Sequence, residues 1–204
     1  MSAEVSYQEP VPVPQAPPVV LASGSPRRRE LLEALGLVFE VRPAEIDETP
    51  QPAEEPRRLV ERLSASKAAH VAQSRPEALV VAADTVVVRH GVILGKPKDA
   101  TENRRFLELL AGGDHDVFTG HCLRLGDRVA STVCRTRVSF RELSGPEMDR
   151  YVATGEGLDK AGGYAIQGHG AALVPRLDGC YFNVVGLSLA AVVELAADLG
   201  AVLV

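Results

Sequence analysis

The sequence lacks tryptophan, has no apolar run long enough to span a membrane, and shows no signal peptide. It has only three cysteines, Cys122, Cys134 and Cys180, without metal-ligand spacing, so we expect reduced thiols rather than a disulfide framework. Basic residues are in the minority, with 22 Lys and Arg against 27 Asp and Glu. We therefore expect a cytoplasmic protein that neither spans a membrane nor binds nucleic acid through bulk charge.

The amino-terminal segment differs in composition from the rest of the chain. Residues 1–18 include five prolines and few large apolar residues, a composition that prevents regular helices and central strands. The remainder is typical of a globular domain, because the whole 204-residue chain is 46% apolar and 24% charged. We expect a disordered, proline-rich tail over residues 1–18 and one folded domain over residues 19–204.

Segments typical of strands and helices alternate along the expected domain. Strands are predicted at 19–22, 38–42, 78–83, 86–88 and 92–94, and a long antiparallel hairpin at 116–125 and 128–140. Helices are predicted after Ser25, at 56–73, at 101–111, from Ser144 to about 154, and at 188–199. The pattern predicts an α/β fold, with a mixed, twisted sheet and flanking helices.

The turn after the first predicted strand has the sequence SGSPRRRE, over residues 23–30. Ser25 suits a helix N-cap and Pro26 the first helical position. Arg27 and Arg28 oppose the helix dipole in the first turn, where acidic residues are usual, which suggests that an anion binds there. An ordinary cap with solvated arginines explains this segment equally well.

Asp84 is the most unusual acidic residue, because it directly follows six apolar residues, where we expect a buried strand to end. Ligands of open α/β sheets collect at the carboxyl ends of strands. A carboxylate at that place has a tuned pKa or binds a metal ion. The alternative, an Asx-turn or helix cap, competes poorly because strand-forming residues continue after Thr85.

Two lysines also stand out by their surroundings. Lys96 is fixed between Gly95 and Pro97, and Lys67 lies on a predicted helix among small alanines. Each lysine by itself is typical of a solvated surface, but together with the two arginines they suit a triphosphate. Asp47 and Glu48, in an acidic loop, are candidates for binding Mg²⁺, although such loops are usually only solvated.

His115 has no second histidine at ligand spacing, so we expect it to be structural. Further along, residues 159–168 combine a charged pair with neighbouring glycines, which allows a ligand to approach the backbone closely. Gln167 in this segment carries both an amide donor and a carbonyl acceptor, as needed to read the edge of a pyrimidine. An ordinary glycine-rich loop fits the segment equally well.

Five motifs appear in order: LASGSPRR at 21–28, ADT at 83–85, GKP at 95–97, H-x-V-x-TG at 115–120 and DKAGGY-x-IQG at 159–168. Together they resemble the Maf family of nucleoside triphosphate pyrophosphatases over about nine-tenths of the chain. The resemblance implies a mixed α/β fold with a deep cleft, related to the inosine triphosphate pyrophosphatases. It also implies hydrolysis of a nucleoside triphosphate to the monophosphate and pyrophosphate, a divalent cation (Mg²⁺ or Mn²⁺), and a homodimer.

The resemblance also assigns roles to individual residues. Asp84 matches the proton acceptor, and Asp47 an acidic position near the metal, although it is one methylene shorter than the glutamate often found there. Positions linked to substrate choice are matched by Arg27, Thr85 and Gln167. The phosphates are expected to contact Ser23, the amides after Ser25, Arg28, Lys67 and Lys96. Thr85 and the IQG ending resemble the branch that acts on dTTP and UTP.

A second interpretation belongs to another class of protein. The chain could be a nucleotide-binding regulator of septum formation and cell division, whose catalysis is not essential. The sequence favours the enzyme, because a sensor has no need for a carboxylate beside the phosphate-binding cluster. A DNA-binding factor is disfavoured by the net charge of −5.

Overall fold

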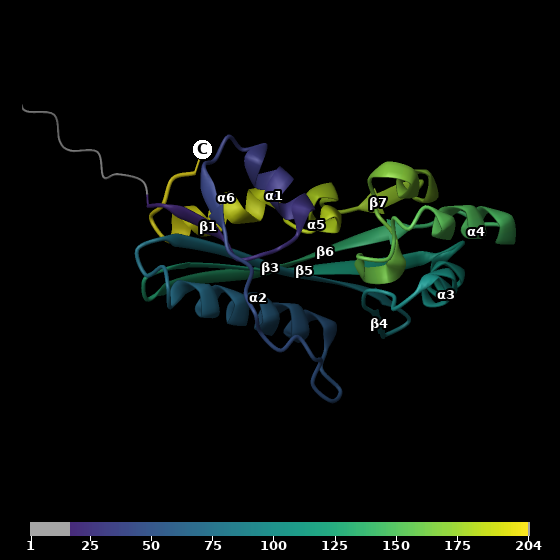
Figure 1. The fold of residues 1–204 in the computed structure, drawn as a ribbon, viewed down its shortest axis with the longest axis horizontal. Coiled ribbons are helices and arrows are strands. Elements are labelled where there is room, and N and C mark those ends of the chain that lie inside the picture. Colours follow the sequence, from purple (N-terminus) through teal and green to yellow (C-terminus); the bar gives the residue numbers. More distant parts are fainter. Residues whose placement is uncertain (1–16, 204) are drawn as a thin grey trace, which may run out of the picture.

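The computed structural model describes residues 17–203, so most of the expected tail lies outside the described residues. The strands are β1 (Val19–Leu21), β2 (Phe39–Val41), β3 (Leu79–Arg89), β4 (Val92–Leu94), β5 (Asp114–Leu125), β6 (Arg128–Ser139) and β7 (Arg176–Asp178). The helices are α1 (Pro26–Glu33), α2 (Pro56–Ala72), α3 (Ala100–Leu110), α4 (Gly145–Ala153), α5 (Tyr181–Val185) and α6 (Leu189–Asp198). Figure 1 shows α2 on one face of the sheet and α1, α5 and α6 on the other.

All seven strands form one mixed sheet, in the order β2-β1-β3-β5-β6-β7, with β4 also paired to β3. Strand β1 runs parallel to both β2 and β3, whereas β3, β5, β6 and β7 pair in antiparallel fashion. Strands β5 and β6 form the expected long hairpin, closed by a turn in which Gly126 has a φ of 59°. The predicted α/β class with a mixed sheet is therefore confirmed.

The prediction that a strand ends at Asp84 is wrong. Strand β3 is 11 residues long and continues past Asp84 to Arg89. The strand persists because β5 pairs with β3 from Leu79 to Val88, with Asp84 opposite Gly120. On the other edge of β3, β1 pairs only as far as Val81, and the pairing with β4 starts only at Val87 of β3. Asp84 therefore lies in the gap between two partner strands, just beyond the carboxyl end of β1.

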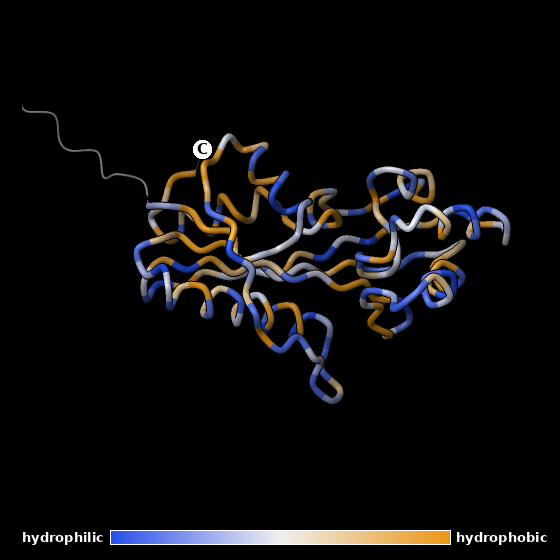
Figure 2. Tube along the Cα trace, in the orientation of Figure 1, coloured by the Kyte–Doolittle hydropathy of each residue, from blue (hydrophilic) through white to orange (hydrophobic). Residues whose placement is uncertain are grey.

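Two layers of apolar side chains hold the helices to the sheet. On one face, Leu59 and Leu63 of α2 pack against Val86 and Val88 of β3. The opposite face of β3 contributes to a larger core, which also includes residues of α1, α3, α4, α5 and α6. In Figure 2 the apolar stretches concentrate in the strands and in α6, consistent with a sheet that is covered on both sides.

Most helices begin close to where the sequence predicts. Asp99, at the N-cap of α3, accepts a hydrogen bond from Glu102 N, and a capping box with Glu147 starts α4 at Ser144. The short elements β7 and α5 were not predicted, because three and five residues carry too little periodicity. Within residues 17–203, no helix is both long and apolar enough to cross a membrane.

Candidate active site

A cavity of about 620 Å³ opens at the gap beside β3. Its walls come from the β1–α1 turn, the acidic loop after β2, α2, β3, the turn after β4, the segment 159–167, and the end of α5 with Gly186. Nine of the residues predicted for the site line it: Ser23, Ser25, Arg27, Arg28, Lys67, Asp84, Thr85, Lys96 and Gln167. The sheet gap thus brings together residues that are up to 144 positions apart.

The cavity wall carries an ammonium group that lies between two carboxylates. Lys67 Nζ lies 2.6 Å from Asp84 Oδ1 and 2.8 Å from Glu48 Oε1. Lys67 and Asp84 are almost completely buried, with side-chain exposures of 9% and 10%, whereas Glu48 is half exposed. Burial of a charged pair requires close geometry of this kind, because isolated charges are strongly disfavoured away from water.

The acidic residue of the loop that reaches this cluster is Glu48, and Asp47 does not line the cavity. Asp47 is exposed and accepts a hydrogen bond from Thr49 N at 2.9 Å, so its carboxylate closes a local turn. Hydrogen bonding from the side chain of Thr49 and from its backbone N–H lowers the pKa of Asp47. Sequence reasoning named both acids as metal candidates but gave the family position to Asp47, because nothing local distinguishes the two.

Arg28 connects three parts of the cavity wall. Its Nε donates to Gly186 O at 2.8 Å, its Nη1 to Ser23 Oγ at 3.1 Å, and its Nη2 to Thr85 Oγ1 at 3.0 Å. Burial lowers the pKa of this guanidinium, and the nearby Asp84 carboxylate opposes the shift. A guanidinium has five N–H donors, so two remain to contact a ligand.

Ser25 occupies the N-cap position of α1 as predicted, but its side chain makes no capping hydrogen bond. Its own N–H instead donates to Ser23 Oγ at 3.2 Å. The first-turn N–H groups of α1 therefore receive no cap from the Ser25 hydroxyl and stay able to bind an anion at the helix N-terminus.

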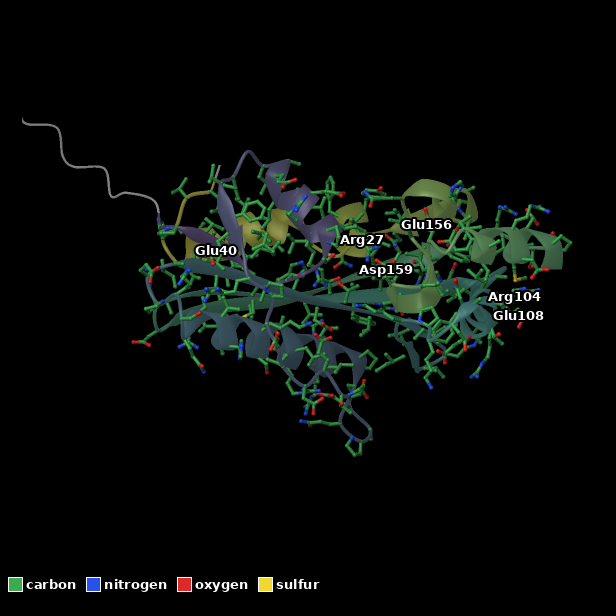
Figure 3. The ribbon with its side chains drawn as sticks, in the orientation of Figure 1. Arg27, Glu40, Arg104, Glu108, Glu156 and Asp159 are labelled. Atoms are coloured by element: carbon green, nitrogen blue, oxygen red, sulfur yellow. The ribbon has the colours of Figure 1, made fainter. Side chains whose placement is uncertain are left out.

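The rim of the cavity carries further charged groups. Arg27 Nη1 lies 4.0 Å from Asp159 Oδ2, and both side chains are seen near each other in Figure 3. Lys160 Nζ pairs with the other oxygen of Asp159. Together with Gln167 these residues also line a second hollow of about 290 Å³ that shares most of its residues with the main cavity. The rim can therefore contact a part of a ligand that lies away from Lys67 and Asp84.

A divalent cation fits the donor set at the centre of the site. Mg²⁺ prefers carboxylate oxygens and is usually held by one or two of them together with substrate phosphates. Asp84 and Glu48 supply two such carboxylates, both within reach of one ammonium. No group of three or more His, Cys, Asp or Glu side chains in residues 17–203 could hold a metal ion by itself. The residues present fit a cation that is bound jointly by protein and phosphate.

His115 is structural, as predicted. Its Nε2 lies 2.7 Å from Tyr164 Oη, and its ring packs edge-on against Phe140 and Tyr164. Burial lowers the pKa of His115 to about 4. His121, which the sequence did not single out, accepts a hydrogen bond from Ser188 N at its Nε2 and also has its pKa lowered by burial to about 4. All three cysteines are free.

Comparison with known proteins shows the family to which the chain belongs. A family model described as "Maf-like protein" matches residues 18–199. The chain belongs to the Maf family. This match confirms the resemblance that the five motifs indicated, and it begins just before β1, where the expected folded domain starts.

Several relatives in the Maf family carry the name dTTP/UTP pyrophosphatase. The protein of that name from Anaeromyxobacter dehalogenans is 52% identical over 86% of this chain and 90% of its own length. The one from Pelotomaculum thermopropionicum is 48% identical over 89% of this chain and 96% of its own. The one from Deinococcus radiodurans is also 48% identical, over 93% of this chain and 97% of its own.

Proposed function

We propose that this protein hydrolyses nucleoside triphosphates, dTTP and UTP above all, to the monophosphate and pyrophosphate. The observation that carries the proposal is the buried pair of Lys67 and Asp84, which lies in a cavity lined by several further cationic side chains. A triphosphate needs such a set of cations, and its hydrolysis needs a carboxylate to accept a proton from water. The relatives named dTTP/UTP pyrophosphatase support the same reaction.

In the proposed reaction, a water oxygen attacks the α-phosphorus and the bond from the α-phosphorus to the bridging oxygen breaks. Asp84 accepts the proton of the water or holds the cation, while Lys67 keeps the carboxylate in place through Oδ1. Arg28, Lys96 and the first-turn amides of α1 offset the charge that builds on the phosphates. Pyrophosphate leaves as the second product.

We assign the divalent cation, Mg²⁺ or Mn²⁺, to Asp84 and Glu48, with substrate phosphates as its further ligands. When bound, the cation supplies neutralisation of phosphate charge at the reacting centre. Asp47 is not assigned as a ligand in this proposal, because its carboxylate accepts a hydrogen bond from Thr49 N and it does not line the cavity. We therefore assign to Glu48 the role of metal ligand that the family resemblance had assigned to Asp47.

Base choice is assigned to the rim of the cavity. The amide of Gln167 can donate to a pyrimidine carbonyl and accept from the ring N3–H, which uracil and thymine both present. Cytosine has an unprotonated N3 and an exocyclic amine, so buried polar groups would be left unpaired. Arg27 and Thr85 also line the cavity and complete the set that we link to substrate choice.

The proposal is tested by measuring pyrophosphate release from UTP, dTTP, CTP, ATP and GTP, with and without Mg²⁺. A mismatched polar group costs about 1–3 kcal/mol, so we expect kcat/KM for UTP and dTTP to exceed that for CTP at least about tenfold. Gln167→Ala should reduce this preference while preserving most of kcat. Equal turnover of CTP and UTP would refute the base assignment. No turnover of any nucleotide with Mg²⁺ would favour the regulatory interpretation instead.

A further inference from the structure

The segment that carries Gln167 is held by two side chains that no motif singled out. Tyr151, in α4, is buried, and its hydroxyl accepts a hydrogen bond from Ala165 N at 3.0 Å. Glu156 follows α4, and its two carboxylate oxygens accept from His169 N at 3.0 Å and from Gly170 N at 2.9 Å. The three amides lie on both sides of Gln167, two residues before it and two and three residues after it.

The contact between these side chains and the segment leaves no spare room. Gly168 has a φ of 61°, and a Cβ at this position would collide with Glu156 Oε1. A Cβ on Gly170 would collide with Ala165 O and lie 3.1 Å from the Tyr151 hydroxyl. Glycine suits position 168 because of its positive φ, and position 170 because the backbone there lies too close to Ala165 O for a side chain.

Thr154 links the backbones of Tyr151 and Glu156 at the end of α4. Thr154 Oγ1 donates to Tyr151 O at 2.6 Å and accepts from Glu156 N at 3.1 Å. Glu156 also lines the second hollow, together with Gln167 and Arg27, and Figure 3 shows Glu156 on the same side of the sheet as Arg27 and Asp159. The backbone on both sides of Gln167 is therefore held in place by the end of α4.

We propose that Tyr151 and Glu156 are positioning residues for base discrimination, which act by fixing the backbone that presents Gln167 at the rim of the cavity. This inference rests on the proposed function, because it gives Gln167 the role of reading the pyrimidine edge. Hydrogen bonds from backbone N–H groups to an ionised carboxylate are stronger than neutral ones, so Glu156 sets the position of the turn more firmly than a hydroxyl could. Discrimination by hydrogen bonding needs such fixed geometry, because a displaced amide pairs equally poorly with every base.

The test uses Glu156→Gln and Tyr151→Phe in the full chain. Glutamine keeps one acceptor oxygen but turns an NH₂ group toward the other backbone N–H, and phenylalanine removes only the hydroxyl. For both variants we expect the ratio of kcat/KM for UTP over CTP to fall at least about threefold, mainly through a higher KM for UTP. The kcat for UTP should stay within about threefold of the parent, because neither side chain is placed at the phosphates.

A matched control is Glu147→Gln, at the other end of α4. Glu147 also accepts a hydrogen bond from a backbone amide, that of Ser144 at 2.9 Å, but it does not line the cavity or the second hollow. This variant should lower stability to a similar degree without moving the UTP to CTP ratio. A general loss of folding is thus separated from a loss of positioning, and Tyr151→Phe provides the answer if Glu156→Gln does not fold.

The double variant Glu156→Gln with Gln167→Ala completes the experiment. If Glu156 acts through Gln167, its substitution should leave the ratio unchanged once the Gln167 amide is gone. If Gln167→Ala alone leaves the ratio at the parent value, the proposed base reader fails. If Gln167→Ala lowers the ratio but neither Glu156→Gln nor Tyr151→Phe does, the positioning inference is overturned while the proposed function stands.

Discussion

Replacement of Lys67 by methionine is the perturbation whose effect follows most directly from the site geometry. Methionine keeps an unbranched chain of similar length but removes the ammonium that lies within 2.8 Å of both Asp84 and Glu48. Asp84, whose side chain is 10% exposed, would then be a buried carboxylate without its cation. Lys67→Met should therefore be strongly destabilising.

The size of the loss follows from the burial of the two partners. Breaking a buried ion pair by removing one member costs about 3–5 kcal/mol, because the other charge is left uncompensated. Glu48 is 55% exposed, so its share should be below about 1 kcal/mol. With a urea m value of about 2–3 kcal/mol/M, the unfolding midpoint at pH 7 should fall by about 1–2.5 M.

Urea unfolding followed by circular dichroism measures this shift. Arg29→Met is the control, because Arg29 pairs with Glu33 at 3.2 Å on the exposed face of α1, where such pairs contribute about 0.3–0.5 kcal/mol. The double variant Lys67→Met with Asp84→Asn should regain most of the lost stability, since it leaves no unpaired buried charge. A midpoint for Lys67→Met that equals that of the control would refute the reasoning.

Two further predictions concern stability. Gly120→Ala should lower the free energy of unfolding by about 1–3 kcal/mol, measured by thermal or urea unfolding, because its Cβ would collide with Val60 O of α2. The control Gly145→Ala, whose Cβ meets only ordinary contacts, should change stability little. Equal stability of the two variants would contradict the close packing at Gly120. The depressed pKa values of His115 and His121, about 4 against 6.5, mean that the unfolded chain binds more protons between these values, so stability should fall as pH drops from 6.5 toward 4. The urea midpoint against pH measures this slope, and His121→Gln should flatten it; an unchanged slope would contradict the assignment.

How much of the fold could be predicted depends on how local its causes are. The helix α2 and the hairpin β5–β6 have clear periodicity and turn residues, so the sequence predicts both within about two residues. The continuation of β3 through Asp84 was missed, because a polar residue after an apolar run is typical of a strand end. Only the long-range pairing with β5, opposite Gly120, keeps the strand extended.

The site residues divide in the same way. Motif residues such as Arg28 and Gln167 line the cavity as predicted, because the motifs that carry them lie at turns beside the sheet gap. Glu48 could not be distinguished from Asp47, since the choice depends on a local turn to Thr49 that the sequence does not reveal. Glu156 gave no signal at all, because an acid in a glycine-rich segment is typical of a solvated loop. Its role depends on backbone amides more than ten residues away.

The central claim, that the Asp84 carboxylate drives hydrolysis at the cavity centre, is tested most directly by pyrophosphate release from dTTP with the Asp84→Asn variant. Asparagine keeps the shape of the side chain but leaves the buried Lys67 with only the half-exposed Glu48 as its partner at 2.8 Å, so the variant should lose stability yet remain folded, which urea unfolding checks. We predict that kcat falls at least about 100-fold, the range typical of a positioned acid–base group. Pyrophosphate release within about threefold of the parent rate by a fully folded variant would contradict the claim.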